Sequence, residues 1–218
     1  MLNEEESKHC AQVLRHQEGD KIMVFNGLGD AYTCTLTRIH KKQCEFIVDA
    51  VDTTQKKPFS IHLGIAPTKN TDRIEWMLEK LCEIGVDKIS FIQTKNSERK
   101  KLRIDRMEKK AISAMKQSKN PWLIKINELD DYSSFLKNSN EDVRLIAHVD
   151  SQHTYISKLI TRNTSVCILI GPEGDFTLDE VRKAKDRGFN TVSLGHNTLR
   201  TETAGLIACC AVNTINEF

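Results

Sequence analysis

Two polar loops near the end of the sequence carry the residue types best suited to chemistry. The first, residues 171–176 (GPEGDF), follows an apolar run over residues 166–170, and the second, residues 199–204 (LRTETA), follows a shorter run over residues 191–195. Short apolar runs bounded by glycine are typical of buried parallel strands, and in open α/β sheets ligands bind outside the carboxyl ends of such strands. The two loops are therefore predicted to meet in one pocket, with a helix starting at a capping box, residues 177–180.

The motifs of these loops resemble those of a known family in their order and spacing. Gly171-x-x-Gly174, Leu194-Gly195 and residues 199–204 are similar to motifs of the RsmE family of ribosomal RNA methyltransferases, which belongs to the SPOUT class. The likeness covers nearly the whole chain, continuing through residues 79–86, residues 117–118 and the first fifty residues.

The sequence also departs from the family pattern. Asp175 stands where the family usually has a second glycine, and an arginine is common near the position of Lys119. Aspartate tolerates a left-handed backbone better than most residues, so the turn at Asp175 is expected to survive. An extra first strand that is common in the family is missing here.

The resemblance implies an α/β fold in which a SPOUT-type trefoil-knot domain with a parallel sheet, residues 59–218, follows a small PUA-like β-barrel that binds RNA, residues 1–57. The barrel is expected to lack its first strand, and the larger domain to form a homodimer. The residues themselves place a boundary at the polar segment 53–58, which ends in proline. Strands alternate with helical patterns after this boundary, as in a parallel sheet covered on both faces.

Apolar spacing locates the elements. A helix is predicted from Asp72 to Ile84, with Gly85 at its C-terminal end, and another helix over residues 204–215. In the first domain we expect a helix over residues 4–15 and strands over 21–25, 31–39 and 44–51. In the second we expect strands over residues 60–66, 88–93, 123–126, 144–149, 166–170 and 191–194.

Composition limits the class of protein. With 218 residues, 39% hydrophobic and 28% charged, the chain has the make-up of a soluble globular protein, and its net charge of +2 requires any attraction to nucleic acid to be local. Seven cysteines without a Cys-x-x-Cys pair, and an odd number, favour reduced thiols and a cytoplasmic protein. No apolar stretch approaches the roughly 20 residues of a membrane helix. The seven histidines show no metal-ligand spacing, so no metal is expected.

The resemblance implies that the pocket binds S-adenosyl-L-methionine. Adenosine needs apolar walls for its base and free backbone groups for its edge and ribose. A glycine pair after a strand is by itself more often a tight turn, and neither a phosphate loop nor a dinucleotide motif is present. The candidate cofactor-binding residues are Leu169, Ile170, Gly171, Gly174, Leu194, Gly195, Thr198 and Leu199.

Three charged residues are candidates for catalysis. The resemblance implies methylation at N3 of one uridine in 16S ribosomal RNA of the small subunit, which requires loss of the N3 proton and stabilisation of the resulting anion. The guanidinium of Arg200 can meet that anion with two donors. Glu173 and Glu202 are candidates to accept the proton, and the sequence does not choose between them. The alternative is structural, with Arg200 and Glu202 in a solvated salt bridge at a helix start.

A basic segment, residues 95–110, carries eight Lys or Arg side chains against three acidic ones. Such segments are often merely solvated helix faces, but this is the densest positive segment of a nearly neutral chain, as phosphate binding requires. Gln117 follows on the same helix. The predicted RNA-binding residues are Arg99, Lys100, Lys101, Arg103, Arg106 and Gln117.

Two other functions remain open from sequence. A SPOUT methyltransferase acting on another RNA, such as tRNA, would carry the same pocket. A ribosome assembly factor that binds RNA without catalysis could keep the fold, although intact Arg200 and Glu202 favour an enzyme.

Overall fold

The computed structural model describes residues 1–149 and 154–216, and the chain divides into two compact units, residues 1–56 and 57–218. Each unit has its own apolar core. In the part of the chain that the structure describes, no helix is long and apolar enough to cross a membrane.

The smaller unit is an antiparallel sheet with one helical segment. Its elements in chain order are α1 (Glu4–Lys8), the π-helical turn η1 (His9–Val13), β1 (Lys21–Phe25), β2 (Asp30–Arg38) and β3 (Glu45–Thr53). The strands pair in the order β1-β2-β3, and within the described residues no pairing of β1 with β3 closes them into the expected barrel. Cys10, Leu36 and Cys44 form a small core under the sheet. The predicted N-terminal helix changes to π-helical hydrogen bonding at His9 and ends at Val13.

The larger unit is built on a six-stranded sheet whose recorded strand pairs are all parallel, which confirms the predicted α/β class. The strands lie in the order β6-β5-β4-β8-β7-β9. Their bounds are β4 (Ser60–Ile65), β5 (Lys88–Gln93), β6 (Lys125–Asp131), β7 (Val143–Ala147), β8 (Ser165–Ile170) and β9 (Asn190–Val192). The strand expected over residues 123–126 begins two residues later and ends five residues further along the chain. The extension was missed because these residues are mostly polar and carry no apolar signal.

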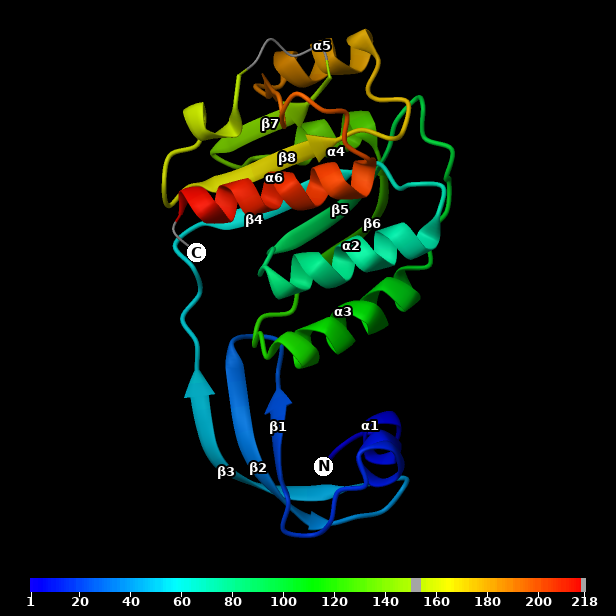
Figure 1. The fold of residues 1–218 in the computed structure, drawn as a ribbon, viewed down its shortest axis with the longest axis vertical. Coiled ribbons are helices and arrows are strands. Elements are labelled where there is room, and N and C mark those ends of the chain that lie inside the picture. Colours follow the sequence, from blue (N-terminus) through cyan, green and yellow to red (C-terminus); the bar gives the residue numbers. More distant parts are fainter. Residues whose placement is uncertain (150–153, 217–218) are drawn as a thin grey trace. The chain divides into compact units, whose positions relative to one another are not determined.

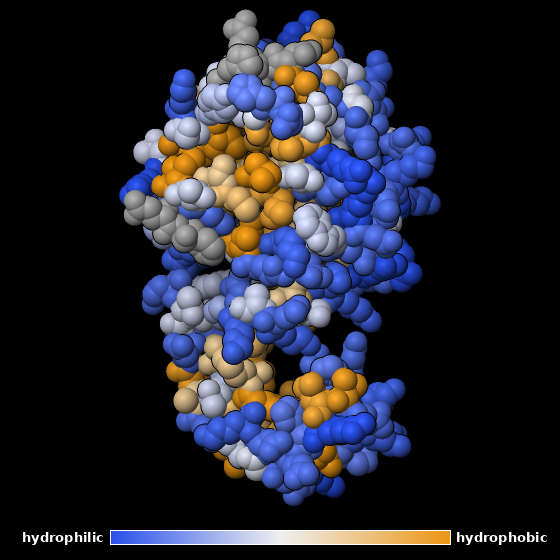
Figure 2. Space-filling view, viewed as in Figure 1, coloured by the Kyte–Doolittle hydropathy of each residue, from blue (hydrophilic) through white to orange (hydrophobic). Residues whose placement is uncertain are grey.

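Helices cover both faces of this sheet. They are α2 (Thr71–Glu83), α3 (Ile104–Ser118), α4 (Tyr132–Asn138), the 3-10 turn η2 (Ile156–Lys158), α5 (Leu178–Asp186) and α6 (Thr201–Ile215). Residues of α2, α3 and α6 share one core with alternate residues of β4, β5 and β8, and residues of α4 and α5 share a second core with the intervening ones. In Figure 1, α6 crosses in front of β4 and β8, and α2 and α3 follow below it. Figure 2 shows apolar side chains gathered in the region of α6.

The predicted helix signals are confirmed. Thr177 and Glu180 form a reciprocal capping box at the start of α5. Gly85 has φ 69° directly after α2, and the Val86 amide donates to the Leu81 carbonyl over 3.0 Å, which closes the helix end.

Candidate active site

A cavity of about 340 Å³ lies at the carboxyl ends of β8 and β9, where the two polar loops meet. We call it the loop cavity. Its lining includes residues 171–173 and Asp175 of the first loop, residues 193–201 of the second, and parts of α2 and β7. The volume is in the range of small-molecule sites in proteins.

Six of the eight predicted cofactor-binding residues line the loop cavity: Ile170, Gly171, Leu194, Gly195, Thr198 and Leu199. Leu169 does not, because side chains alternate along a strand and Leu169 is buried in the core beneath α4 and α5, on the other face from Ile170. Gly174 does not line it either. Its carbonyl accepts a hydrogen bond from Asn96 Nδ2 over 3.0 Å, so Gly174 joins the loop to the segment that follows β5.

The first loop is held by Asp175, which has φ 54°, the left-handed conformation expected for the family's glycine position. One carboxylate oxygen accepts from the Phe176 amide over 2.7 Å, and the other lies 2.7 Å from His148 Nδ1. A Cβ on Gly171 would lie 3.1 Å from Asp175 Oδ1 and from the Phe176 amide nitrogen. A side chain at Gly171 would therefore force its own loop to shift by a few tenths of an ångström.

The second loop exposes its backbone at Gly195, which has φ 130°. A Cβ built there meets no atom within 4 Å, so it would project into open space of the cavity. Ser193 Oγ lies within hydrogen-bonding distance of both the amide and the carbonyl of Gly195 and fixes the turn. Only glycine adopts this φ without strain.

Arg200 lines the loop cavity at the N-cap position of α6, and its side chain is exposed. Among the described residues no carboxylate pairs with it, so the salt bridge between Arg200 and Glu202 that the structural alternative required is not formed. Glu173 also lines the cavity and is exposed, and its Oε1 accepts from the Lys69 amide over 3.2 Å. These two residues present opposite charges to one space.

Glu202 lies away from the cavity lining. It is 6% exposed, and its Oε1 lies 3.7 Å from Arg73 Nε. Its Oε2 is buried without a hydrogen-bond partner among the described residues. Arg73, in the first turn of α2, does line the cavity. Glu202 therefore contacts a residue of the lining, Arg73, and does not line the cavity itself.

His196, the one histidine that the sequence places in the second loop, lines the cavity, whereas sequence reasoning missed Arg73, His148 and Asn197. Asn197 lies inside the same loop and could have been included from its position alone. Arg73 and His148 follow β4 and β7, and the sequence did not show that these strands flank β8.

The basic segment is partly neutralised. Arg103 pairs with Asp105 over 3.0 Å, Arg106 donates to Glu75 over 3.0 Å, and Arg99 donates to the Thr68 and Lys69 carbonyls. Lys100, Lys101 and Gln117 are exposed. The two lysines are therefore available to a phosphate, as are the equally exposed Lys95 and Lys109. Of the seven histidines, His153 lies outside the described residues.

Comparisons with known proteins agree with this geometry. Residues 55–213 match the model of an RNA methyltransferase domain, and residues 2–49 match an RNA methyltransferase PUA domain. Ribosomal RNA small subunit methyltransferase E of Buchnera aphidicola is 30% identical over 98% of this chain and 87% of its own length. The enzyme of that name from Bacillus subtilis is 25% identical over 98% of this chain and 89% of its own length.

Solved structures show the same fold. A probable rRNA-methyltransferase from Porphyromonas gingivalis is 41% identical, with a TM-score of 0.93 over 99% of this chain and 93% of its own. Ribosomal RNA small subunit methyltransferase E of Neisseria gonorrhoeae, bound to S-adenosyl methionine, is 29% identical, with a TM-score of 0.90 over 98% of this chain and 90% of its own. The predicted SPOUT fold class with a PUA-like first unit is confirmed, and this chain belongs to the RsmE family of RNA methyltransferases.

Proposed function

We propose that this protein transfers a methyl group from S-adenosyl-L-methionine to N3 of a uridine in 16S ribosomal RNA of the small subunit. The observation that carries the proposal is the loop cavity, in which an unpaired guanidinium, Arg200, and an open glycine turn, Gly195, lie together in a chain of this family. The small-subunit relatives support ribosomal RNA over tRNA as the substrate.

The residues present fit the cofactor. Ile170, Leu194 and Leu199 offer apolar walls, and the exposed turn at Gly195 offers backbone groups to a base edge and a ribose. The space beside Gly195, which any Cβ would enter, is available to a ligand. S-adenosyl-L-methionine supplies an electrophilic methyl group when it is bound.

Arg200 stabilises the uracil anion that forms when N3 loses its proton. Its guanidinium faces the cavity without an internal carboxylate partner, so both of its outer donors are available to uracil oxygens. Glu173 is the carboxylate that faces the same space and is the candidate to accept the N3 proton. Glu202 holds Arg73 at the cavity edge, which assigns it a positioning role.

The exposed lysines of the segment after β5, Lys100 and Lys101, contact the RNA backbone in this proposal, together with Arg99, Arg103, Arg106 and Gln117 at its edges. We further propose a homodimer formed through α6. Supporting this, Ile207 is 43% exposed on that helix beside the partly buried Leu206 and Ala211, an apolar surface that a second copy would cover. A ribosomal substrate and free cysteines agree with a cytoplasmic location.

The test is methylation of purified small-subunit rRNA or small subunits with labelled S-adenosyl-L-methionine, followed by nucleoside mass spectrometry. We expect 3-methyluridine at one position and S-adenosyl-L-methionine binding in a calorimeter. Methylation of tRNA alone would transfer the assignment to another RNA. Absence of cofactor binding in the folded protein would support the non-catalytic assembly factor instead.

A further inference from the structure

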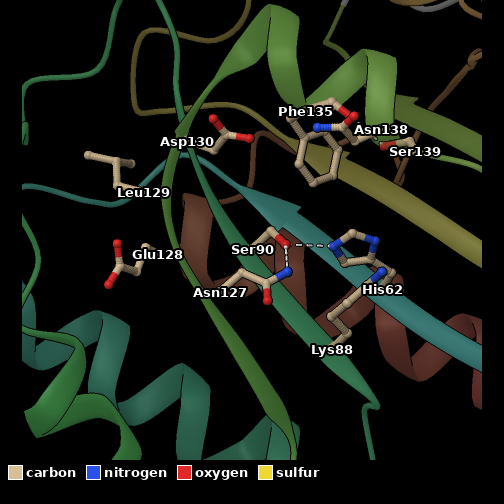
Figure 3. Close-up of a pocket in the computed structure, with 10 residues that line it drawn as sticks. All are labelled: His62, Lys88, Ser90, Asn127, Glu128, Leu129, Asp130, Phe135, Asn138 and Ser139. Atoms are coloured by element: carbon tan, nitrogen blue, oxygen red, sulfur yellow. Dashed lines mark hydrogen bonds between the residues drawn. The ribbon is translucent and has the colours of Figure 1, made fainter.

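A line of polar side chains crosses the sheet face beneath α4, away from the loop cavity. His62 of β4, Ser90 of β5 and Asn127 of β6 lie in the amino-terminal halves of three adjacent strands (Figure 3). His62 is 6% exposed and Ser90 is 3% exposed. A parallel sheet covered on both faces normally buries apolar residues at such positions, so a buried polar row requires an explanation.

The hydrogen bonds of this row run in one direction. Glu141, in the loop before β7, lies 2.6 Å from His62 Nδ1. Burial opposes its ionisation, but the hydrogen bond from His62, helped by the nearby Lys88 ammonium, outweighs burial and lowers the pKa of Glu141 to about 2. An ionised carboxylate only accepts, so His62 Nδ1 donates and Nε2 is left as an acceptor for the Ser90 hydroxyl, 2.7 Å away. Asn127 Nδ2 in turn donates to Ser90 Oγ over 2.8 Å.

The row forms the floor of a second cavity, of about 420 Å³, which we call the ladder cavity. Ser90 and His62 both line it, and Phe135 of α4 lies opposite, with its ring centroid 5.2 Å from that of His62. The pairing of β5 with β6 slips by one residue directly after Ser90. Irregularities of this kind occur often beside active sites, where they redirect a side chain.

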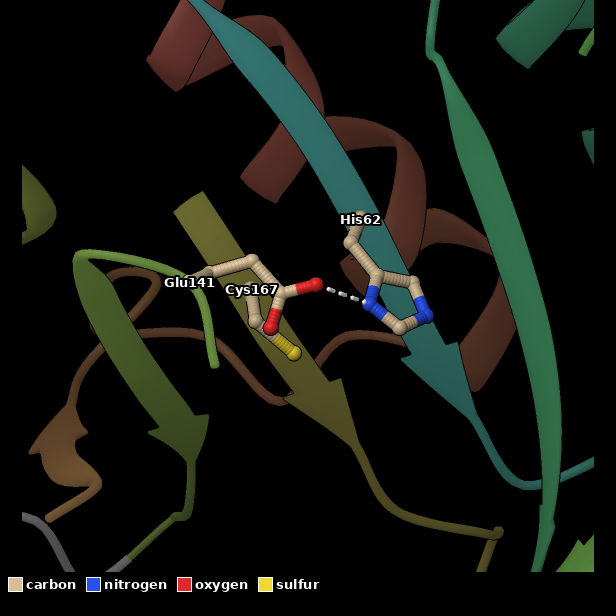
Figure 4. A group of neighbouring side chains, drawn as sticks. All are labelled: His62, Glu141 and Cys167. Atoms are coloured by element: carbon tan, nitrogen blue, oxygen red, sulfur yellow. Dashed lines mark hydrogen bonds and ion pairs between the residues drawn. The ribbon is translucent and has the colours of Figure 1, made fainter. Parts of the chain in front are cut away.

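The same residues do not form a good metal site. Among the described residues, His62, Glu141 and Cys167 are the group whose ligand atoms lie within 4.8 Å of one another (Figure 4). The 2.6 Å separation of His62 Nδ1 and Glu141 Oε1 is that of a direct hydrogen bond, and the ammonium of Lys88 lies 3.1 Å from the same oxygen. Burial also raises the pKa of the Cys167 thiol well above its ordinary value. A cation would have to displace a proton and an ammonium group.

The arrangement fits nucleophilic catalysis instead. A serine hydroxyl bonded to a histidine, whose other nitrogen is oriented by a carboxylate, is the geometry of serine hydrolases on unrelated folds. We propose that Ser90, His62 and Glu141 form a second catalytic centre, which hydrolyses short-chain carboxylic esters that enter the ladder cavity.

The reaction proceeds in two balanced steps. Ser90 Oγ bonds to the acyl carbon as its proton moves to His62 Nε2, and the alcohol leaves with that proton. Water then gives a proton to His62 Nε2 and attacks the acyl-serine, and the carboxylic acid leaves as Ser90 regains its proton. Asn127 Nδ2 and the Lys88 ammonium, both at the cavity, are the donors available to the oxyanion.

The lining restricts the substrate. The cavity has room for a small ester, and Phe135 provides an apolar wall for the acyl group. Glu128 and Asp130 are exposed at the lining and repel anions. Neutral or cationic esters are therefore favoured over esters that carry a carboxylate or phosphate.

The test uses a fluorophosphonate probe and 4-nitrophenyl acetate on the full-length protein. We expect one covalent adduct, located on Ser90 by peptide mapping, and a burst of 4-nitrophenolate equal to the amount of protein. Ser90→Ala should lose the adduct and at least a hundredfold in ester hydrolysis. Ser139→Ala is the matched control, since Ser139 lines the same cavity and its hydroxyl donates to the Phe135 carbonyl rather than to His62, and it should label normally.

Glu141→Gln is a second test variant. It keeps the shape of the side chain but no longer fixes the tautomer of His62, so the probe should label Ser90 at least tenfold more slowly. Methyl transfer by Ser90→Ala should equal that of the unmodified protein, which shows that the variant is folded and that the two centres are independent. No adduct on Ser90 of the unmodified protein, or equal labelling of Ser90→Ala, would overturn the proposal and leave the row a structural polar network only.

Discussion

The loop cavity lies at the carboxyl ends of β8 and β9, whereas the ladder cavity lies on the face of the same sheet beneath α4, and the two differ in what lines them. The loop cavity is lined mainly by segments that follow strands, with glycine and left-handed positions that expose backbone, as at Gly195 and Asp175. The ladder cavity has a floor of side chains that project from the strands themselves. Each cavity brings together most of the groups that its proposed reaction needs. Loop backbone positions them in the loop cavity, and strand side chains position them in the ladder cavity.

Because of this difference, the two cavities should respond differently to substitution. The geometry of the loop cavity depends on backbone conformation, so a single Cβ in the wrong place removes space for a ligand. That of the ladder cavity depends on buried hydrogen bonds, so removal of one partner leaves another polar group unsatisfied, at a cost of about 1–3 kcal/mol. Substitutions in the loop cavity should therefore change binding or rate with little change in stability. Substitutions in the hydrogen-bonded row under the ladder cavity should change the stability of the protein and its dependence on pH.

The largest effect on methyl transfer is expected from Arg200→Ala. If Arg200 stabilises the uracil anion, single-turnover methyl transfer should fall by about a hundredfold or more while affinity for S-adenosyl-L-methionine stays nearly normal. Arg200→Lys should restore little, because one point charge does not reproduce a planar fork. Arg187→Ala, an exposed arginine at the end of α5, is the control. Full activity of Arg200→Ala, with only a small loss of melting temperature, would return Arg200 to a structural role.

The next effect concerns cofactor binding at Gly195. Gly195→Val should abolish binding of S-adenosyl-L-methionine, and Gly195→Ala should weaken it by about tenfold, since the new Cβ enters the open space and φ 130° is strained for any L residue. Gly19→Ala is a matched control, with φ 94° and equally open surroundings in the other unit. Calorimetric affinity and melting temperature should be measured on both. Equal affinity of Gly195→Ala and the unmodified protein would remove Gly195 from the binding site.

Acid should destabilise the folded protein through Glu141 and His62 of the hydrogen-bonded row. Glu141 has a pKa of about 2 in the folded protein against 4.5 in the unfolded chain, so its contribution is present above pH 4.5 and is lost as the pH falls toward 2. Burial lowers the pKa of His62 below 6.5, so protonation of His62 also favours the unfolded chain at acid pH. Glu141 alone should cost about 1 kcal/mol of unfolding free energy between pH 7 and pH 4.

Urea unfolding at several pH values measures this. Glu141→Gln should flatten the dependence between pH 5 and pH 3, whereas Glu173→Gln, an exposed carboxylate of the loop cavity, should leave it as it is. If the unfolding free energy changes with pH to the same extent in Glu141→Gln and in the unmodified protein, Glu141 does not control stability in acid.

The smallest effect concerns RNA affinity. Lys100→Ala with Lys101→Ala should weaken RNA binding without changing sequence preference, and should reduce the slope of log affinity against log salt by about 1.4 for single-stranded contacts. Arg103→Ala, whose guanidinium pairs with Asp105, should change the slope less. An unchanged slope in the double variant would leave the segment a solvated surface.

Local signals in the sequence determined a large part of this fold. The apolar spacing of α2 placed Ile74, Met77, Leu78, Leu81 and Cys82 in the core, where all are buried. The capping box at Thr177 and the left-handed turn at Asp175 were readable because each depends on residues close in the chain. The assignment of the two loops and Arg200 to one pocket had another basis, namely the rule that ligands bind at the carboxyl ends of parallel strands and the resemblance to the RsmE family.

Only the tertiary structure decided which strands are neighbours. Hydrogen bonds between parallel strands join backbone groups that every residue has, so the order β6-β5-β4-β8-β7-β9 follows from long-range packing of helices on the sheet and leaves no local signal. That order brings Arg73 to Glu202 and to the loop cavity. It also aligns His62, Ser90 and Asn127, which lie 28 and 37 residues apart, into one hydrogen-bonded row.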